Sequence, residues 1–237
     1  GDHRDLHTAY RRQRQMCIRD RGRNSEQSTS SDWLRRLYGI HKMTADGSIT
    51  TLLTLDLPNN LRACIHSSHI NGDLLIGLSN ESYTRTARVM RCDGTGRKIG
   101  DIELDEEGKR LYEYPLYITE NKMNGDIVVS DDRKNALVVV DRSGRHRFDY
   151  TGHSTDESFY PRGVCTDFTD LLGRILVVHT DMIYAKCISL LDHDGKFLTR
   201  LLTESVYLND KIAFRSLCVD DKNNIYVAHG DKIKVFR

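Results

Sequence analysis

The sequence predicts an all-β fold built from repeated units of about 50 residues. Four similar segments, NGDLLIG, NGDIVVS, LGRILVV and KNNIYVA, begin at residues 71, 124, 172 and 222, so their starts are 53, 48 and 50 residues apart. A second series of turn glycines agrees with them: Gly47, Gly96, Gly144 and Gly195 are separated by 49, 48 and 51 residues. Self-similarity at this period is typical of a repeat architecture.

Each repeat reads as four short strands. In one repeat the segments 161–167, 174–179, 186–192 and 196–202 are rich in Val, Ile and Leu and are separated by Gly and Asp turns. This pattern favours strands over helices. An Asp-Gly type turn before the fourth strand predicts a hairpin, because Gly takes the positive φ that such turns need. Four antiparallel strands in about 40–50 residues predict a β-propeller blade.

Three regions are predicted along the chain. Residues 1–23 show no apolar periodicity, and QMCIRDR (15–21) corresponds to a sequencing-adapter end translated in frame. We therefore interpret residues 1–23 as a disordered cloning remnant; the alternative is a native basic tail that binds nucleic acid or membrane. Residues 24–32 (NSEQSTSSD) read as a linker, and residues 33–237 as a partial propeller.

Composition excludes several classes of function. Residues 1–23 hold seven Arg and three Asp of the chain's 35 Lys+Arg and 34 Asp+Glu, which leaves 28 against 31. A mildly acidic domain has no global attraction for phosphate backbones. The six Cys show no zinc-finger spacing, so no RING or B-box is expected within this chain, and a reduced, cytoplasmic location fits. No run of 18 apolar residues occurs, so no membrane partner is predicted.

The repeat resembles a known family. The unit PRGVCTD…GRILVVH…ISLLDHDG and the stretch DRKNALVVVD at 132–141 resemble NHL-repeat propellers, over roughly residues 39–237. The stretch VVVDRSGRHRFDYTGH is similar in particular to the C-terminal domain of tripartite-motif (TRIM-NHL) proteins. The resemblance implies an N-terminally truncated propeller with about four to five of six blades present.

The same resemblance implies a function. The chain would be the substrate-recognition domain of a RING-type E3 ubiquitin ligase and itself non-catalytic. The RING and an oligomerising coiled coil would lie outside this sequence. An RNA-binding NHL regulator of mRNA, with single-stranded or hairpin RNA as partner, is the alternative. A metal-dependent propeller hydrolase or lyase is a further alternative, which requires carboxylate and His ligands in the channel.

The candidate partner-binding face is the entrance of the central channel, which the first strand of each blade lines. We expect protein or RNA to bind at Arg133, Lys134, Tyr160, Arg162 and Arg215. Guanidinium groups suit phosphate or carboxylate, and aromatic rings stack on bases or fill partner pockets. The same rim is expected to include Arg62, Tyr83, Arg85, Arg88, Tyr112, Tyr114 and Tyr207. Alternatively, the arginines pair with Asp of the neighbouring blade as structural struts.

Two other recurring positions favour structural roles. Cys64, Thr119, Cys165 and Cys218 are predicted to share one repeat position and to pack as small buried side chains, not to bind metal. His179 and His229 occupy the position of Asp131, where capping of a strand end is favoured. No Gly-x-Ser-x-Gly or His-Glu-x-x-His motif occurs. We therefore predict no catalytic residue, no metal and no cofactor.

Overall fold

The fold is almost entirely β-structure. The computed structural model describes residues 15–21, 35–44, 46–58, 61–80, 86–166, 172–180, 186–204, 214–220 and 222–236. Within these ranges every regular element is a strand, which confirms the all-β prediction. The same ranges contain no helix with the length and apolar character needed to cross a membrane.

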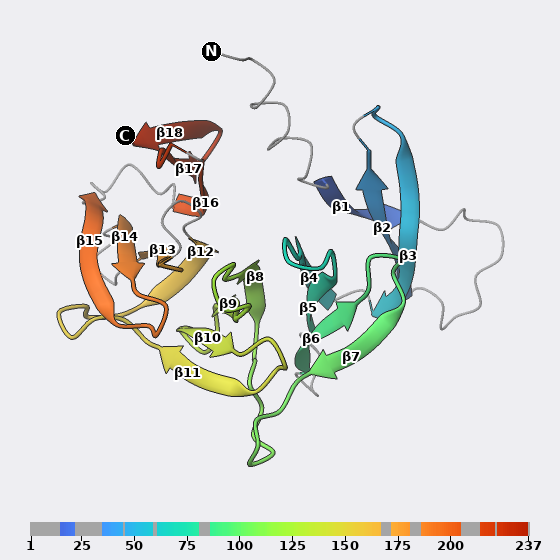
Figure 1. The fold of residues 1–237 in the computed structure, drawn as a ribbon, viewed down its shortest axis with the longest axis horizontal. Helices are drawn as coiled ribbons and strands as arrows, with labels where there is room; N and C mark the ends of the chain where they lie inside the picture. The colour runs from blue at the N-terminus through green and yellow to red at the C-terminus, as the bar shows by residue number, and fades with distance from the viewer. Residues whose placement is uncertain are drawn as a thin grey trace.

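The strands form five antiparallel sheets in chain order (Figure 1). The N-terminal sheet has the strands β1 (Gln15–Arg21), β2 (Arg35–Met43) and β3 (Ile49–Pro58). Blade I has β4 (Leu61–Ser67), β5 (Leu74–Asn80), β6 (Ala87–Cys92) and β7 (Lys98–Ile102). Blade II has β8 (Pro115–Glu120), β9 (Ile127–Asp131), β10 (Ala136–Val140) and β11 (His146–Tyr150).

Blade III has β12 (Tyr160–Thr166), β13 (Ile175–Thr180), β14 (Lys186–Leu191) and β15 (Phe197–Glu204). Blade IV has three strands, β16 (Phe214–Val219), β17 (Ile225–His229) and β18 (Lys232–Phe236). The three complete blades confirm the prediction of four strands per repeat.

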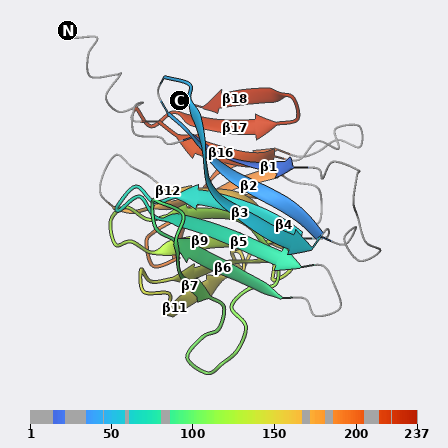
Figure 2. The same ribbon diagram turned by 90° about the vertical axis from the view of Figure 1, so that its right-hand side faces the viewer.

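The blades stand side by side in a propeller arrangement. The first strands are neighbours around the arc, because β4 contacts β8, β8 contacts β12, and β12 contacts β16. Figure 1 shows blades I to IV along this arc, with the N-terminal sheet next to blade I, and Figure 2 shows the same arc from the side of the N-terminal sheet. A four-blade propeller is therefore present; NHL type, six blades in total and N-terminal truncation stay predictions.

Apolar side chains on both faces of each blade hold the arc together. Val128 and Val139 of blade II pack against Val164 and Val177 of blade III in one buried cluster. Comparable clusters join blade I to II, blade III to IV, and the N-terminal sheet to blade I. Because blades I, II and III are covered on both faces, their central strands read as continuous apolar runs such as ALVVV in β10, and not as an alternating pattern.

The turn before each fourth strand is an Asp-Gly hairpin, as predicted. In blade II, Asp141 accepts hydrogen bonds through its carboxylate from the backbone N–H groups of Ser143 and Arg145. Gly144 has a φ of 92°, a left-handed conformation that glycine adopts without steric cost. Asp93 and Asp192 organise the equivalent turns of blades I and III.

Residues 15–21 differ from the expectation of disorder for residues 1–23. They form β1, which pairs antiparallel with β2 from Gln15↔Met43 to Arg21↔Leu37. Backbone pairing along an open strand edge depends little on side-chain identity, so a sequence without periodicity can still occupy it. Residues 1–14 and 24–32 lie outside the described residues, and the origin of residues 1–23 stays a prediction.

Candidate functional site at the channel mouth

Every blade has the same strand order, so the inner strands β4, β8, β12 and β16 begin at one end of the channel. We call this end the channel mouth and define it by Arg62 on β4, Tyr117 on β8, Arg162 on β12 and Arg215 on β16. Three inner strands thus contribute a guanidinium group each to the same end of the channel, as the sequence predicted for Arg162 and Arg215.

Tyr117 is the residue that β8 of blade II contributes to the mouth. Burial raises the pKa of its phenol, and the positive charges of Arg215 and Arg162 oppose that rise. Both guanidinium groups are therefore within electrostatic reach of one phenol, although they come from different blades. Tyr117 is not among the residues that the sequence predicts for this site, because it lies inside a strand whereas the predicted tyrosines lie in loops.

Arg162 is already paired within the fold. Its guanidinium lies 2.7 Å from the carboxylate of Asp132, which belongs to the turn between β9 and β10 of blade II. This is the inter-blade strut considered as the alternative interpretation. Because both side chains are about one-third exposed, the pair contributes at most about 1 kcal/mol to stability.

Arg62 and Arg215 are exposed and differ from Arg162 in having no such pairing. Neither forms a hydrogen bond or an ion pair with any residue that the structure describes. Their charges are therefore not used for cohesion of the described fold. A free guanidinium presents a planar fork of N–H donors that matches a carboxylate or phosphate.

The remaining predicted residues lie near the mouth but have different environments. Arg133 is exposed, and its guanidinium carbon lies 5.3 Å from the centre of the Tyr114 ring. Lys134 donates a hydrogen bond to the carbonyl oxygen of Leu111 (2.8 Å) and pairs with Asp149 (3.1 Å), so its ammonium is engaged within blade II. Tyr160 is half-buried at the start of β12, opposite Thr180.

Other residues expected at the rim have mixed outcomes. The prediction for Tyr112 is wrong: its side chain is fully buried in the cluster between blades I and II, because the segment before β8 folds inward. That burial raises the pKa of its phenol. Arg88 lies 3.5 Å from the Asp101 carboxylate within blade I. Tyr83, Arg85 and Tyr207 lie outside the described residues.

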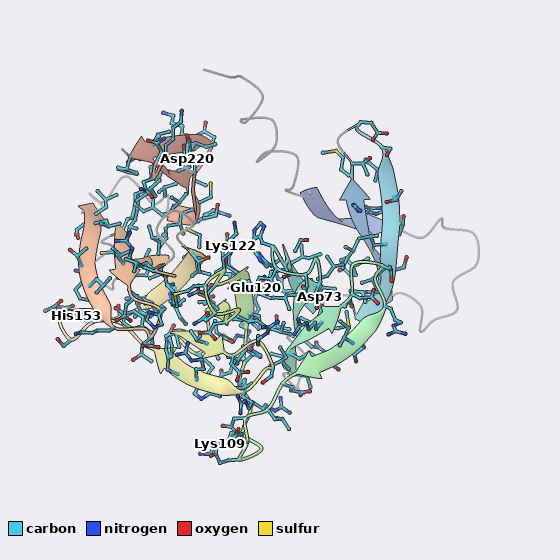
Figure 3. The ribbon with its side chains drawn as sticks, in the orientation of Figure 1. Asp73, Lys109, Glu120, Lys122, His153 and Asp220 are labelled. Carbon is cyan, nitrogen blue, oxygen red and sulfur yellow. The ribbon has the colours of Figure 1, made fainter. Side chains whose placement is uncertain are left out.

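At the opposite end of the channel, polar groups of neighbouring blades bind one another. The Ser68 hydroxyl donates a hydrogen bond to the Glu120 carboxylate (2.6 Å), and the Thr166 hydroxyl donates to the Glu120 carbonyl oxygen (3.0 Å). The Asn121 amide donates to the carbonyl oxygen of Gly173 (2.7 Å). Figure 3 shows Glu120 near the centre of the arc. These contacts join blades I, II and III.

His66 lies on β4 near this polar end. Burial lowers the pKa of its imidazole to about 4, and the nearby His69 adds to the effect. Its Nε2 atom is buried and has no hydrogen-bond partner within the described ranges. The ring is therefore neutral at pH 7.

The predicted equivalence of four inner-strand positions needs one correction. Thr119, Cys165 and Cys218 do share a position, since they pair with Val128, Leu176 and Tyr226. In blade I that position is His66, which pairs with Leu75, and Cys64 lies two residues earlier. Cys64 and Cys165 both lie eight residues before a glycine, Gly72 and Gly173, but the connection after Cys165 is two residues longer than the one in blade I.

The second recurring position is confirmed. Asp131, His179 and His229 pair with Pro115, Pro161 and Phe214 at the start of their inner strands. Asp131 caps the strand end: its carboxylate accepts hydrogen bonds from the backbone N–H groups of Glu113, Tyr114, Arg133 and Lys134. Across the described ranges, no group of three or more His, Cys, Asp or Glu side chains is placed to hold a metal ion.

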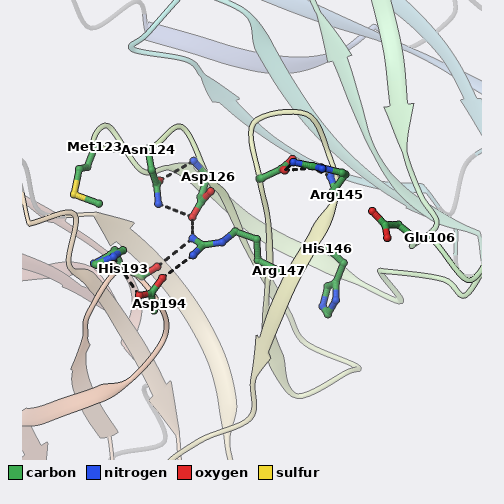
Figure 4. Close-up of a pocket in the computed structure, with 10 residues that line it drawn as sticks. Glu106, Met123, Asn124, Asp126, Arg145, His146, Arg147, His193 and Asp194 are labelled. Atoms are coloured by element: carbon green, nitrogen blue, oxygen red, sulfur yellow. Dashed lines mark hydrogen bonds and ion pairs between the residues drawn. The ribbon is translucent and has the colours of Figure 1, made fainter.

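An open pocket of about 590 Å³ lies between blades II and III (Figure 4). Arg147 crosses it and pairs with Asp126 of its own blade and with Asp194 of blade III. The same guanidinium lies 3.5 Å from the carbonyl oxygen of His193. The charged groups at the centre of this pocket are thus paired with one another, and the arrangement works as an inter-blade strut.

Comparisons with known proteins identify the fold. No family model and no curated protein matches the sequence. A protein from Dyadobacter fermentans matches with a TM-score of 0.59 and 13% identity, over 93% of this chain and 74% of that one. A gluconolactonase from Xanthomonas campestris matches with a TM-score of 0.54 and 16% identity, over 85% and 68%. Regucalcin, a calcium-binding protein from Agrobacterium tumefaciens, matches with a TM-score of 0.51 and 18% identity, over 82% and 64%.

These matches establish a β-propeller and leave the NHL and TRIM assignment a prediction. They also overturn the prediction that this chain is not an enzyme. That prediction relied on missing catalytic signatures and on a resemblance to non-catalytic propellers, whereas the propellers that match include a gluconolactonase. Because one fold hosts many functions, the function has to be argued from the site.

Proposed function

We propose that this chain is a β-propeller recognition module that binds an acidic segment of a protein partner at the channel mouth. The observation that carries the proposal is the pair of exposed guanidinium groups of Arg62 and Arg215 on inner strands, which have no ion-pair partner among the described residues. Arg215 and Arg162 both lie within electrostatic reach of Tyr117. Arginine and tyrosine are the side chains that most often dominate the affinity of protein interfaces.

The resemblance to TRIM-NHL propellers extends the proposal to a class of partner. In that reading the acidic segment belongs to a substrate in the cytoplasm, which the module presents to a RING outside this sequence. Arg133 and Tyr160 supply further contacts at the edge of the mouth, and Lys134 positions the turn that carries Arg133.

The test is binding of a fluorescent 12-residue Glu/Ser peptide, followed by anisotropy. We expect Arg62→Glu plus Arg215→Glu to weaken binding by about 30-fold or more, because loss of a single interface anchor costs about 2 kcal/mol. The matched control is Arg97→Glu on an exposed turn of blade I, which should leave affinity unchanged. Equal affinity of the double variant and the wild type would show that the channel mouth is not the binding site for the acidic peptide.

RNA is the competing partner and forms a second arm of the same experiment. Single-stranded and hairpin RNA probes of similar length are titrated at 50 and 200 mM salt. Tighter binding of RNA than of peptide, a steep loss with salt and sensitivity to the same double variant would assign the mouth to RNA.

Hydrolysis of a lactone is the second candidate function. The Ser68–Glu120 pair supports it, because the pair places a buried carboxylate against a hydroxyl at the polar end of the channel, in a fold shared with a gluconolactonase. The test is hydrolysis of glucono-δ-lactone at constant pH, with and without added Ca²⁺. Turnover that Glu120→Gln abolishes while the fold is retained supports this candidate, and the absence of turnover under both conditions rejects it.

A further inference from the structure

Two of the arginines at the channel mouth come from strands that touch. A Cβ atom added at Gly163 on β12 would lie 2.4 Å from Cα of Ser216 on β16 and 3.0 Å from the carbonyl oxygen of Arg215. Arg162 and Arg215 directly precede Gly163 and Ser216 and occupy the same repeat position. Blades III and IV therefore hold two guanidinium-bearing residues side by side.

Blade II contributes a phenol to the same level of the channel. Strand pairing gives Tyr117 the repeat position that Gly163 has in blade III, so β12 carries no side chain where β8 carries this ring. The ring is half-buried and packs against the cluster between blades II and III. The charges of Arg215 and Arg162 both act on the phenol, so Arg215 is within electrostatic reach of a residue two blades away along the arc. The three groups thus come from consecutive blades.

Among the residues that the structure describes, one of the two arginines is paired with a carboxylate and the other is not. The Asp132 carboxylate of blade II lies 2.7 Å from the Arg162 guanidinium. Asp131 is buried and accepts hydrogen bonds from backbone N–H groups of its own blade, and Glu113 adds an exposed carboxylate in the segment before β8. The strands β12 and β16 contain no Asp or Glu. A positive charge on Arg215 therefore remains at the contact between blades III and IV, where a bound anion is stabilised.

The donors at this place suit a phosphate monoester better than a carboxylate. A carboxylate has two oxygens and a single charge, and Asp132 already offers such a group to Arg162. A phosphate monoester has three acceptor oxygens and a charge of about −1.5 to −2 at neutral pH. Two guanidinium forks and one phenol O–H match these oxygens. Burial raises the pKa of the Tyr117 phenol, so the phenol keeps its proton and is a donor.

We propose that the mouth recognises a phosphate monoester on a phosphorylated Ser or Thr side chain of the protein partner. This inference rests on the proposed function and narrows the acidic segment to one chemical group. Arg215 and Arg162 donate hydrogen bonds to the phosphate, with Arg162 exchanging its bond to Asp132, and Tyr117 donates through its hydroxyl. A phosphodiester of RNA has two free oxygens and one charge, so it matches the three donors less well.

The test uses three versions of the 12-residue Glu/Ser peptide that differ only at the central position, which is Ser, Glu or phosphoserine. At about pH 7.5 we expect the phosphoserine peptide to bind at least about tenfold more tightly than the Glu peptide, because additional charge-assisted hydrogen bonds form. At about pH 5 the phosphate carries less charge, since its second pKa is near 6, and the advantage should fall to about threefold or less. Equal affinities of the Glu and phosphoserine peptides at the higher pH would overturn the inference and leave the proposed function intact.

Two substitutions separate recognition of phosphate from attraction to any acidic group. Arg215→Gln should reduce the ratio of phosphoserine to Glu affinity to about twofold or less, because one guanidinium fork is lost. Tyr117→Phe should reduce the ratio by about threefold, because one O–H donor is lost. The matched control is Tyr38→Phe, which changes a half-buried tyrosine next to the N-terminal sheet cluster and should leave the ratio unchanged. A ratio unchanged by Arg215→Gln and Tyr117→Phe would overturn the inference, and the ratio does not depend on the fraction of folded protein.

The same titrations distinguish the source of the phosphate. Tighter binding of a single-stranded RNA of similar length than of the phosphoserine peptide would assign the mouth to nucleic acid and overturn the inference. No binding of any of the three peptides would reject the proposed function itself, and the inference with it.

Discussion

The two ends of the channel are held together in different ways. At the mouth, β12 and β16 approach so closely that a Cβ added at Gly163 would lie 2.4 Å from Cα of Ser216. At the polar end, Ser68, Glu120 and Thr166 connect neighbouring blades through side-chain hydrogen bonds. At the mouth, blades III and IV are therefore in direct backbone contact and the Arg162–Asp132 ion pair joins blades II and III, whereas at the polar end side-chain hydrogen bonds join the blades.

This difference separates the roles of charged residues. Of the three arginines at the strand entrances, Arg162 joins two blades through Asp132, whereas Arg62 and Arg215 project without partners among the described residues. Where side chains join the blades, their polar atoms are already used. The difference between the two ends indicates that the mouth is available to bind a partner and that the polar end stabilises the packing of the blades.

The largest expected effect on stability is at Gly163. Gly163→Ala should lower the free energy of unfolding by about 1–3 kcal/mol, because the new methyl group overlaps the backbone of β16 and the blades have to separate. Gly100→Ala is the matched control, since a Cβ there meets no atom within 4 Å and its φ is not in the left-handed region. Urea unfolding measures both. Equal stability of the two variants would show that blades III and IV are not in close contact.

The polar end should respond to loss of one hydroxyl. Ser68→Ala leaves the buried Glu120 carboxylate without a hydrogen-bond donor, so we expect a loss of about 1–2 kcal/mol in urea unfolding. Ser143→Ala removes a comparable hydroxyl–carboxylate hydrogen bond from an exposed turn and should cost about 0.5 kcal/mol or less. If both variants lose the same free energy of unfolding, the hydrogen bond between Ser68 and Glu120 does not stabilise the packing of the blades.

A pH titration tests the burial of His66. Its folded pKa of about 4 lies below the ordinary value of 6.5, so the unfolded chain takes up the proton first. The free energy of unfolding should have its full value above pH 6.5. It should decrease as the pH drops from 6.5 toward 4, by about 1 kcal/mol for this partly exposed ring. His66→Gln should remove this part of the slope, and His193→Gln near the outer pocket should retain it. An unchanged slope in His66→Gln would contradict the predicted burial.

The smallest effect concerns the pairing of Arg162. Asp132→Ala releases this guanidinium, and we expect the affinity for the acidic peptide to rise by about two- to fivefold, in line with the small energy of an exposed ion pair. Asp149→Ala, which removes the partner of Lys134, is the control and should change affinity less. Weaker binding after Asp132→Ala would mean that the strut positions Arg162 for the partner.

Much of the fold follows from local sequence. The spacing of the NGD and Asp-Gly turns determined the number of strands per repeat, because turn chemistry depends on a few neighbouring residues and on positive φ. The runs of Val, Ile and Leu determined which strands are buried. The predicted equivalence of Cys64 with Cys165 was wrong, because the connection between β12 and β13 is longer than the one between β4 and β5. The spacing of the turn glycines does not reveal this difference in length.

The candidate site depended on tertiary structure. The sequence placed Arg162 and Arg215 at the strand entrances, but only the packing of the blades decided that Arg162 pairs with Asp132 while Arg215 has no ion-pair partner among the described residues. The packing of the blades also brought Tyr117 within electrostatic reach of both arginines and buried Tyr112. The sequence by itself determined what each blade is, because strands and turns are short-range features. Which charges remain available for a partner was decided between blades, by contacts among residues about 30 or more positions apart in the chain.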